Sequence, residues 1–143
     1  LVKPSADKAD QRIKQVSMPT ESGILVCLGS GAKIVRRYVE RWTTSGQAGG
    51  RTSRAVFSGF CDAIGSGGDR QTGGSPQLCG LYREGTAMSY GLVWESKRFF
   101  LGLNVSDHPG LQVEWRNRRF ERVDANGDLL PKAQRQPSPR SSK

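Results

Sequence analysis

Four short runs with apolar side chains at every second position constrain the fold more than any other feature of the sequence. They are Gln77–Arg83, Ala87–Trp94, Arg98–Val105 and Leu111–Arg116. Successive side chains of a β-strand point to opposite faces, so this alternation predicts strands with one face on a core. The connecting triplets at 84–86 and 95–97 are short enough to be hairpin loops. These patterns predict an antiparallel meander.

A further tight turn is predicted at Asn126-Gly127. It follows a possible strand at Arg119–Val123, and Leu129 and Leu130 would return from it. With this addition, the sequence predicts a sheet of about five strands.

One amphipathic helix is predicted over Ala32–Thr43, because apolar residues recur there at spacings of one and three. The apolar positions are Ile34, Val35, Tyr38, Val39 and Trp42. The opposite face would carry Lys33, Arg36, Arg37, Glu40 and Arg41. We expect this helix to cover the sheet and to expose a basic surface.

Two other segments precede the sheet region. The apolar run Ile24–Leu28, closed by glycines, predicts a buried strand over Gly23–Gly29. The segment Ser53–Ile64 fits either a short helix or a strand followed by a turn, and its pattern does not separate these two.

The predicted fold class is α+β: an antiparallel meander of about five strands packed against one main amphipathic helix, with disordered termini. The expected organisation is a polar N-terminal arm at 1–21, one domain at 22–130 and a basic tail at 131–143. The tail is rich in Pro, Ser, Gln and Arg and has no apolar periodicity, so it is expected to be disordered alone.

The chain has a formal net charge of +9, which favours polyanionic partners without specifying one. No apolar run approaches the roughly 18–20 residues that would cross a bilayer, so no membrane partner is expected. Three cysteines and one histidine, with no CxxC pair, predict reduced thiols, no metal site and a cytoplasmic location. The sequence predicts no cofactor.

The densest basic cluster lies at the end of the predicted sheet, where Arg116, Arg118, Arg119 and Arg122 alternate with the aromatics Trp115 and Phe120. Arginines there can neutralise phosphates while aromatics stack on bases. We therefore expect a non-enzymatic basic protein that binds nucleic acid or docks in a nucleic-acid-containing assembly. A second contact would use the helical face with Arg36, Arg37 and Arg41. The competing interpretation is that the aromatics belong to the core and the arginines are solvated neighbours.

An alternative function rests on the glycine-rich loop Gly65–Gly74, which carries Asp69, Arg70, Gln71 and Thr72. Such a loop can hold an anionic or polar small molecule, with Arg70 binding the anion, in a small enzyme or a ligand-binding protein. The simpler interpretation is a flexible surface excursion.

Two other groups of residues lack the spacing of the phosphate-binding or catalytic motifs that they resemble in composition. Gly29-Ser30-Gly31-Ala32-Lys33 lies where a phosphate loop would lie, but it lacks the glycine spacing of both standard phosphate-binding motifs. Cys61, Asp62 and His108 have no spacing typical of a cysteine enzyme. No catalytic residue is predicted.

Overall fold

The computed structural model describes residues 16–17, 19–44, 50–81 and 85–139. Residues 1–15 and 18 of the predicted arm at 1–21 lie outside the described residues. So do the strand position Tyr82, the loop residue Glu84 and the tail bases Arg140 and Lys143.

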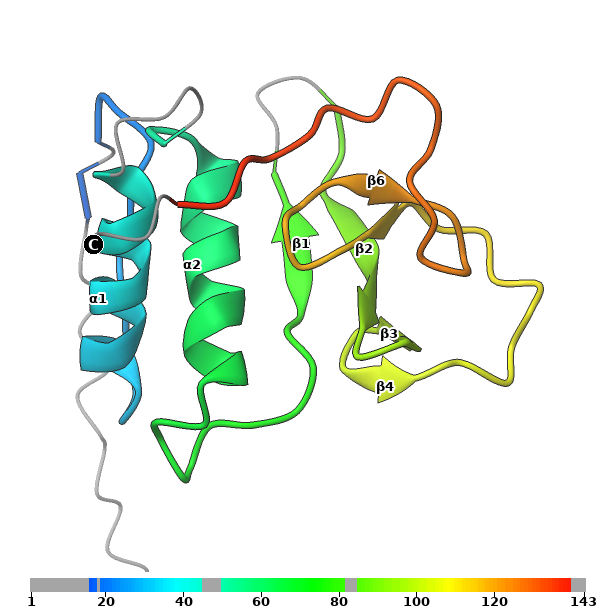
Figure 1. Ribbon diagram of the computed structural model, residues 1–143, viewed down its shortest axis with the longest axis horizontal. Helices are drawn as coiled ribbons and strands as arrows, with labels where there is room; N and C mark the ends of the chain where they lie inside the picture. Colours follow the sequence, from blue (N-terminus) through cyan, green and yellow to red (C-terminus); the bar gives the residue numbers. More distant parts are fainter. Residues whose placement is uncertain (1–15, 18, 45–49, 82–84, 140–143) are drawn as a thin grey trace, which may run out of the picture.

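Two helices lie side by side on one side of a sheet (Figure 1). Helix α1 spans Ala32–Thr43, as predicted, and α2 spans Ser53–Gly65. The segment Ser53–Ile64, whose pattern fits either a helix or a strand, is therefore a helix. Thr52 caps its start, because the Thr52 side chain accepts a hydrogen bond from the backbone N–H of Ala55. Such a cap satisfies one of the otherwise unpaired amides of the first turn.

Helix α2, not α1, covers the sheet, which corrects the expectation of one main helix. Phe57 and Cys61 of α2 form a core cluster with Leu92 of the sheet. Helix α1 packs on the outer side of α2, where a side chain on Gly59 would lie 2.6 Å from the Cα atom of Val39. The glycine thus allows a very close approach of the two helices.

Within the described residues the sheet has six short strands: β1 (Leu78–Gly80), β2 (Met88–Trp94), β3 (Lys97–Phe100), β4 (Leu103–Asn104), β5 (Trp115–Arg116) and β6 (Arg122–Val123). Its order is β4-β3-β2-β5-β6, and β1 pairs with β2. The β2–β3 hairpin turns at Glu95 and Ser96, both with positive φ, as the short loop predicts. The predicted return after Asn126-Gly127 is also present, because Leu129 forms a bridge with Val123.

The sheet is mixed, which corrects the predicted antiparallel meander. The run Arg98–Val105 is broken by a turn at Leu101 and Gly102, where φ is 50° and 81°. This turn reverses the chain into β4, and the following segment crosses to the other side of β2. There β5 pairs parallel to β2, with Gly91 opposite Trp115.

The predicted strand at Gly23–Gly29 is wrong. No strand forms there, and Leu25, Val26 and Leu28 are 44%, 52% and 86% exposed. Apolar content alone cannot make a strand, because each strand needs a neighbour for its backbone hydrogen bonds.

The first nine tail residues have defined positions and cross α2 (Figure 1). Gln136 is 4% exposed, and its backbone N–H donates a hydrogen bond of 2.8 Å to the buried carboxylate of Glu121. Arg54 of α2 donates to the carbonyl of Gln134. The limits of the domain and of the tail stay a prediction.

Candidate functional site

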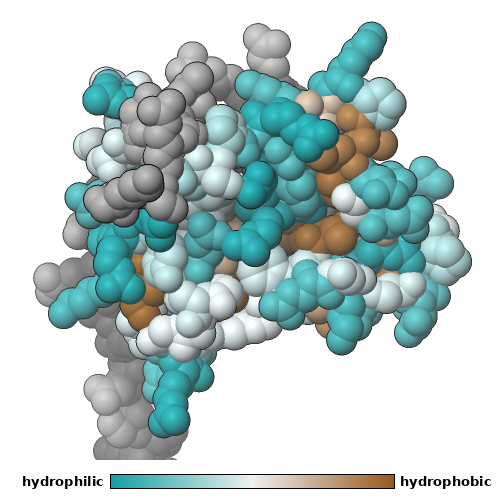
Figure 2. All heavy atoms as spheres, in the orientation of Figure 1, coloured by the Kyte–Doolittle hydropathy of each residue, from teal (hydrophilic) through white to brown (hydrophobic). Residues whose placement is uncertain are grey.

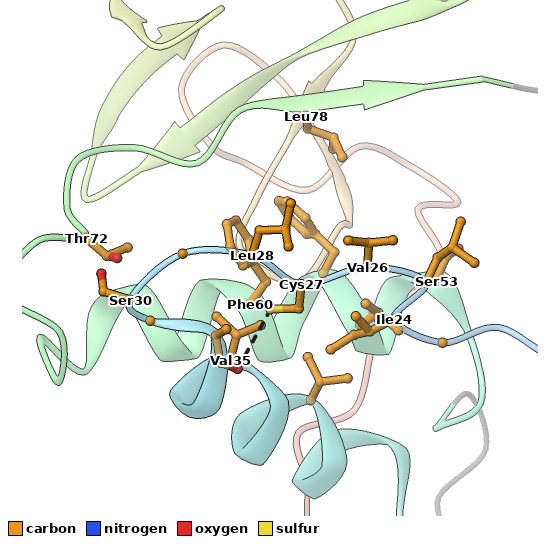
Figure 3. A pocket seen from close by; sticks show the side chains of 18 of the residues that line it. Ile24, Val26, Cys27, Leu28, Ser30, Val35, Ser53, Phe60, Thr72 and Leu78 are labelled. Carbon is orange, nitrogen blue, oxygen red and sulfur yellow. Dashed lines mark hydrogen bonds between the residues drawn. The ribbon is translucent and has the colours of Figure 1, made fainter. Parts of the chain in front are cut away.

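A pocket of about 860 Å³ lies between the helices, the segment Gly23–Gly31 and the start of the sheet. This volume falls within the roughly 300–1,000 Å³ of typical ligand pockets. Figure 3 shows Leu78 of β1 on one side and the segment with Val26 and Leu28 on the other, with Phe60 of α2 nearby. Ser30 and Thr72 lie together at one end. The pocket is therefore apolar along its length and polar at this end.

The apolar segment Ile24–Leu28 forms one wall of the pocket. Cys27 points towards the helices, where its thiol donates to the carbonyl of Ala32, while Val26 and Leu28 point the other way (Figure 3). Two large apolar side chains thus face open space beside the pocket.

The two hydroxyls at the polar end of the pocket both bond to the carboxylate of Asp69, which does not itself line the pocket. The hydroxyls of Ser30 and Thr72 each donate to its Oδ2 atom at 2.6 Å, and the amide of Gln71 donates to Oδ1 at 3.2 Å. The hydrogen bond from Ser30, followed by those from Thr72 and Gln71, lowers the pKa of Asp69 from its ordinary value. The group is therefore an ionised carboxylate at neutral pH.

Close packing at the start of α1 holds this arrangement together. Gly31 is buried, and a side chain on it would lie 3.1 Å from both Asp69 Oδ2 and Thr72 Oγ1. Gly68 lies similarly close to Ile34 of α1. The loop after α2 is therefore seated against the N-terminus of α1, where a negative charge is favourable.

The hydrogen bonds that Ser30 and Thr72 already make limit which ligand groups can bind at the polar end. A hydroxyl has one proton, and Ser30 and Thr72 both direct theirs to Asp69. Their remaining lone pairs can only accept hydrogen bonds. Together with the ionised carboxylate, they favour a ligand group that donates hydrogen bonds or carries positive charge.

The other predicted loop residues divide between the pocket and solvent. Gln71 and Thr72 line the pocket, but Arg70 is exposed and is absent from its lining. The loop thus presents Gln71 and the Thr72 hydroxyl to the pocket, while neither Asp69 nor Arg70 lines it.

The predicted arginine cluster is largely engaged by acidic groups of the protein itself. Arg116 pairs with Glu114, donates to the carbonyl of Phe120 and lies 4.5 Å from the centroid of that ring. Arg122 lies 3.7 Å from Glu114, and Arg118 lies 2.6 Å from Asp62. Arg119 is exposed, and no salt bridge of its side chain occurs within the described residues.

The predicted basic face of α1 is exposed, at Lys33, Arg36, Arg37 and Arg41. Its end meets the arginine cluster, because Arg41, Arg118 and Arg119 line one cavity of about 370 Å³. Asp62 lies in this cavity and accepts hydrogen bonds from Trp42 and Arg118. The structure thus joins two basic segments that are far apart in the sequence. Much of the face that includes the tail is hydrophilic (Figure 2).

Cys61 is fully buried, and burial raises the pKa of its thiol to about 12. Such a thiol is not a nucleophile at neutral pH. His108 lies in an exposed loop. These observations argue against a cysteine site built on Cys61.

Neither helix of the described chain is long and apolar enough to cross a bilayer. Across the same residues, no group of three or more His, Cys, Asp or Glu side chains could hold a metal ion. Comparison with protein-family models, curated proteins and solved structures gives no significant match.

Sequence reasoning identified Asp69, Gln71 and Thr72 but missed Ser30 as their partner. In the sequence, Ser30 stands in the segment Gly29–Lys33, which lacks the spacing of a phosphate-binding motif and does not point to Asp69. The one available signal was that glycines flank both Ser30 and the Asp69–Thr72 turn, which allows two backbones to approach closely.

Proposed function

We propose that the protein binds a ligand in the 860 Å³ pocket, with an apolar body along α2 and a hydrogen-bond-donating group against Ser30 and Thr72. The observation that carries this proposal is the double donation of the two hydroxyls to Asp69. It leaves acceptors, backed by a carboxylate, beside an apolar cavity. This develops the alternative drawn from the glycine loop, with a donor group in place of an anion.

Two fluorescent probes with the same apolar ring test this proposal. We expect 1-naphthylmethylamine, a cation at pH 7, to bind more tightly than 1-naphthylacetate, an anion. Asp69→Asn keeps the shape of the side chain but removes its charge, so it should weaken amine binding severalfold. Arg70→Gln is the matched control. Within the described residues Arg70, unlike Asp69, forms no hydrogen bond with Ser30 or Thr72, so this change should leave amine binding unchanged.

Tighter binding of the acetate, with loss on Arg70→Gln, would support the anionic ligand of the glycine-loop interpretation instead. If neither probe binds, or if Asp69→Asn and Arg70→Gln have equal effects, the pocket proposal is wrong.

A second candidate function is binding of nucleic acid, or docking in a nucleic-acid-containing assembly, through the basic surface. It is favoured by the meeting of Arg41, Arg118 and Arg119 around one cavity beside the exposed face of α1. Phosphates neutralised there would release counterions, so affinity would fall steeply as salt rises. Arg116 and Arg122 would contribute less, because both lie beside Glu114.

Fluorescence anisotropy with single- and double-stranded oligonucleotides tests this second function. We expect binding at low salt that Arg119→Glu weakens more than Arg70→Glu, an equal charge change on another exposed loop. Equal losses would indicate only a net-charge effect, and absence of binding at low salt would exclude the function. Under both functions we place the protein in the cytoplasm, where free Cys27, Cys61 and Cys79 stay reduced.

A further inference from the structure

The tail segment around Ser138 is held in place, yet its hydroxyl is accessible. Gln136, two residues earlier, is anchored because its backbone N–H donates to the carboxylate of Glu121. Ser138 itself is exposed, and its hydroxyl makes no hydrogen bond with any residue that the structure describes. Pro137 and Pro139 flank it, and a residue before proline is biased towards an extended backbone. The segment therefore presents Ser138 to solvent at a defined place.

Three arginines from two other parts of the chain meet the tail at this point. Arg41 of α1, together with Arg118 and Arg119 after β5, lines the cavity of about 370 Å³ that Ser138 also lines. The tail reaches this place by crossing α2 towards α1 (Figure 1). The cavity is far larger than the roughly 30 Å³ that one water occupies in the liquid, so it has room for a phosphate group.

The charges that line this cavity suit a phosphate dianion. The arginines carry three positive charges, and Asp62, the one acidic residue among the described lining residues, carries a negative charge. The excess of two positive charges matches the charge of about −1.5 to −2 that a phosphoserine has at pH 7. Asp62 already accepts hydrogen bonds from Trp42 and Arg118. It therefore orients Arg118 instead of opposing a phosphate as an unpaired carboxylate.

Two of the three arginines still have their guanidinium groups available. Across the described ranges, neither Arg41 nor Arg119 forms a salt bridge or a side-chain hydrogen bond. A guanidinium group donates parallel hydrogen bonds to phosphate oxygens, and a phosphoserine offers three acceptor oxygens. A phosphate on Ser138 could therefore bind to both groups at once.

We propose that Ser138 is a phosphorylation site and that the three arginines hold its phosphate. A serine kinase would transfer the γ-phosphoryl group of a nucleoside triphosphate to Ser138 Oγ. The new bond joins Oγ to the γ-phosphorus, and the bond from that phosphorus to the oxygen of the leaving nucleoside diphosphate breaks. The hydroxyl proton passes to a base of the kinase. The bound phosphate would fasten the tail to α1 and to the turn after β5, beyond the anchor at Gln136.

This inference goes beyond both proposed functions, because it concerns a covalent change of the chain itself and needs no bound ligand. Its outcome is therefore independent of whether the pocket binds naphthylmethylamine or the basic surface binds oligonucleotides.

Labelling of the whole chain with ATP and a proline-directed serine kinase tests the site. Ser75 is the matched control, because it is the only other serine followed by proline in the sequence. It is half-buried, and its hydroxyl donates to the carbonyl of Pro76, whereas Ser138 is exposed. We expect mass spectrometry to find at least about tenfold more phosphate on Ser138, because Ser75 must first open locally. Equal labelling of the two, or none on Ser138, would overturn the site.

Phosphoserine incorporated at position 138 during translation tests the arginine receptor without a kinase. A ³¹P NMR titration measures the second pKa of the phosphate, which is ordinarily about 6. We expect this pKa to be lower by about one in the folded protein than in urea, because the arginines favour the dianion. Phosphoserine at position 96 is the control, since Ser96 is exposed in the β2–β3 hairpin and outside the described lining of the cavity. Its phosphate should keep the ordinary pKa.

Arginine substitutions in the protein with phosphoserine at position 138 complete the test. Arg41→Gln and Arg119→Gln should each raise the phosphate pKa towards its ordinary value, whereas Arg70→Gln, an equal charge change on another exposed loop, should not. All three side chains are exposed, so the variants should stay folded. A phosphate pKa that is equal in folded and unfolded protein would overturn the receptor. Equal effects of the three substitutions would show only a net-charge effect and would overturn it as well.

Discussion

The carboxylate of Asp69 accepts a hydrogen bond of 2.6 Å from the hydroxyl of Ser30, which is 39 residues earlier in the chain. The contact ties the loop after α2 to the start of α1, at the end of the pocket where Ser30 and Thr72 lie. Ser30 lines the pocket together with Thr72, so the contact fixes the position of a hydroxyl at its polar end.

We predict that Ser30→Ala and Thr72→Val each raise the pKa of Asp69 towards its ordinary value of 3.8, because each removes a hydrogen bond that favours the charged form. The NMR titration of the Asp69 carboxyl carbon measures this directly. Ser75→Ala, which removes a hydroxyl bonded to a backbone carbonyl instead, should leave the titration unchanged. An Asp69 pKa that stays low in both variants would contradict the proposed cause.

The same lowered pKa predicts how stability depends on pH. The folded state holds the Asp69 proton less tightly than the unfolded chain does, so the contribution to stability is present above the unfolded pKa of about 3.9. It is lost as pH falls through the lowered folded value. Urea unfolding of the wild type and of Asp69→Asn should therefore show a stability difference that shrinks below about pH 4. A difference independent of pH would contradict this linkage.

We predict that Gly59→Ala destabilises the protein by at least about 1–3 kcal/mol, the usual cost of overpacking. The new methyl group would lie 2.6 Å from the Cα atom of Val39, and backbone cannot move aside as a side chain can. Gly65→Ala, in the same helix with no atom within 4 Å, is the control. Urea unfolding should show equal or higher stability for this second variant, since alanine favours helix.

We predict unequal reactivity of two cysteines towards iodoacetamide at pH 8. Cys79 is exposed and should be alkylated in the folded protein, whereas Cys61 should react only after unfolding, because burial raises the pKa of its thiol to about 12. Mass spectrometry of peptides from native and urea-treated protein locates the modification. Rapid alkylation of Cys61 in the native state would show that the reagent reaches the core cluster of Phe57, Cys61 and Leu92 without unfolding.

Deleting residues 131–143 should destabilise the domain, although the composition of this segment is typical of a disordered tail. The deletion leaves the buried Glu121 carboxylate without the Gln136 amide, and losing a partner for a buried acceptor costs about 1–3 kcal/mol. Deleting only residues 140–143 keeps that contact and should have little effect. Calorimetric melting of the two truncations gives the comparison, and equal melting temperatures would refute a structural role for Gln136.

Sequence patterns predicted several elements well, because these elements depend on interactions between residues close together in the chain. The spacing of Ile34, Val35 and Val39 predicts α1, and the short loop at Glu95-Ser96 predicts the β2–β3 hairpin. By contrast, Ser53–Ile64 has a pattern compatible with two structures, and the Thr52 cap and packing on α1 decide for a helix. The break at Leu101-Gly102 depends on two positive φ values that the alternating pattern does not reveal.

The α+β class, the course of α1, the positions of most strands and the net charge follow from the amino-acid order, because periodicity and composition act over a few neighbouring residues. Long-range packing fixes which helix covers the sheet and the parallel pairing of β5 with β2. It also brings Arg118 to Asp62 and Ser30 to Asp69. Each of these depends on segments many residues apart that must share one space. Ile24–Leu28 is an apolar segment typical of a strand, but no strand of the described chain pairs with it, and a strand exists only where another backbone completes its hydrogen bonds.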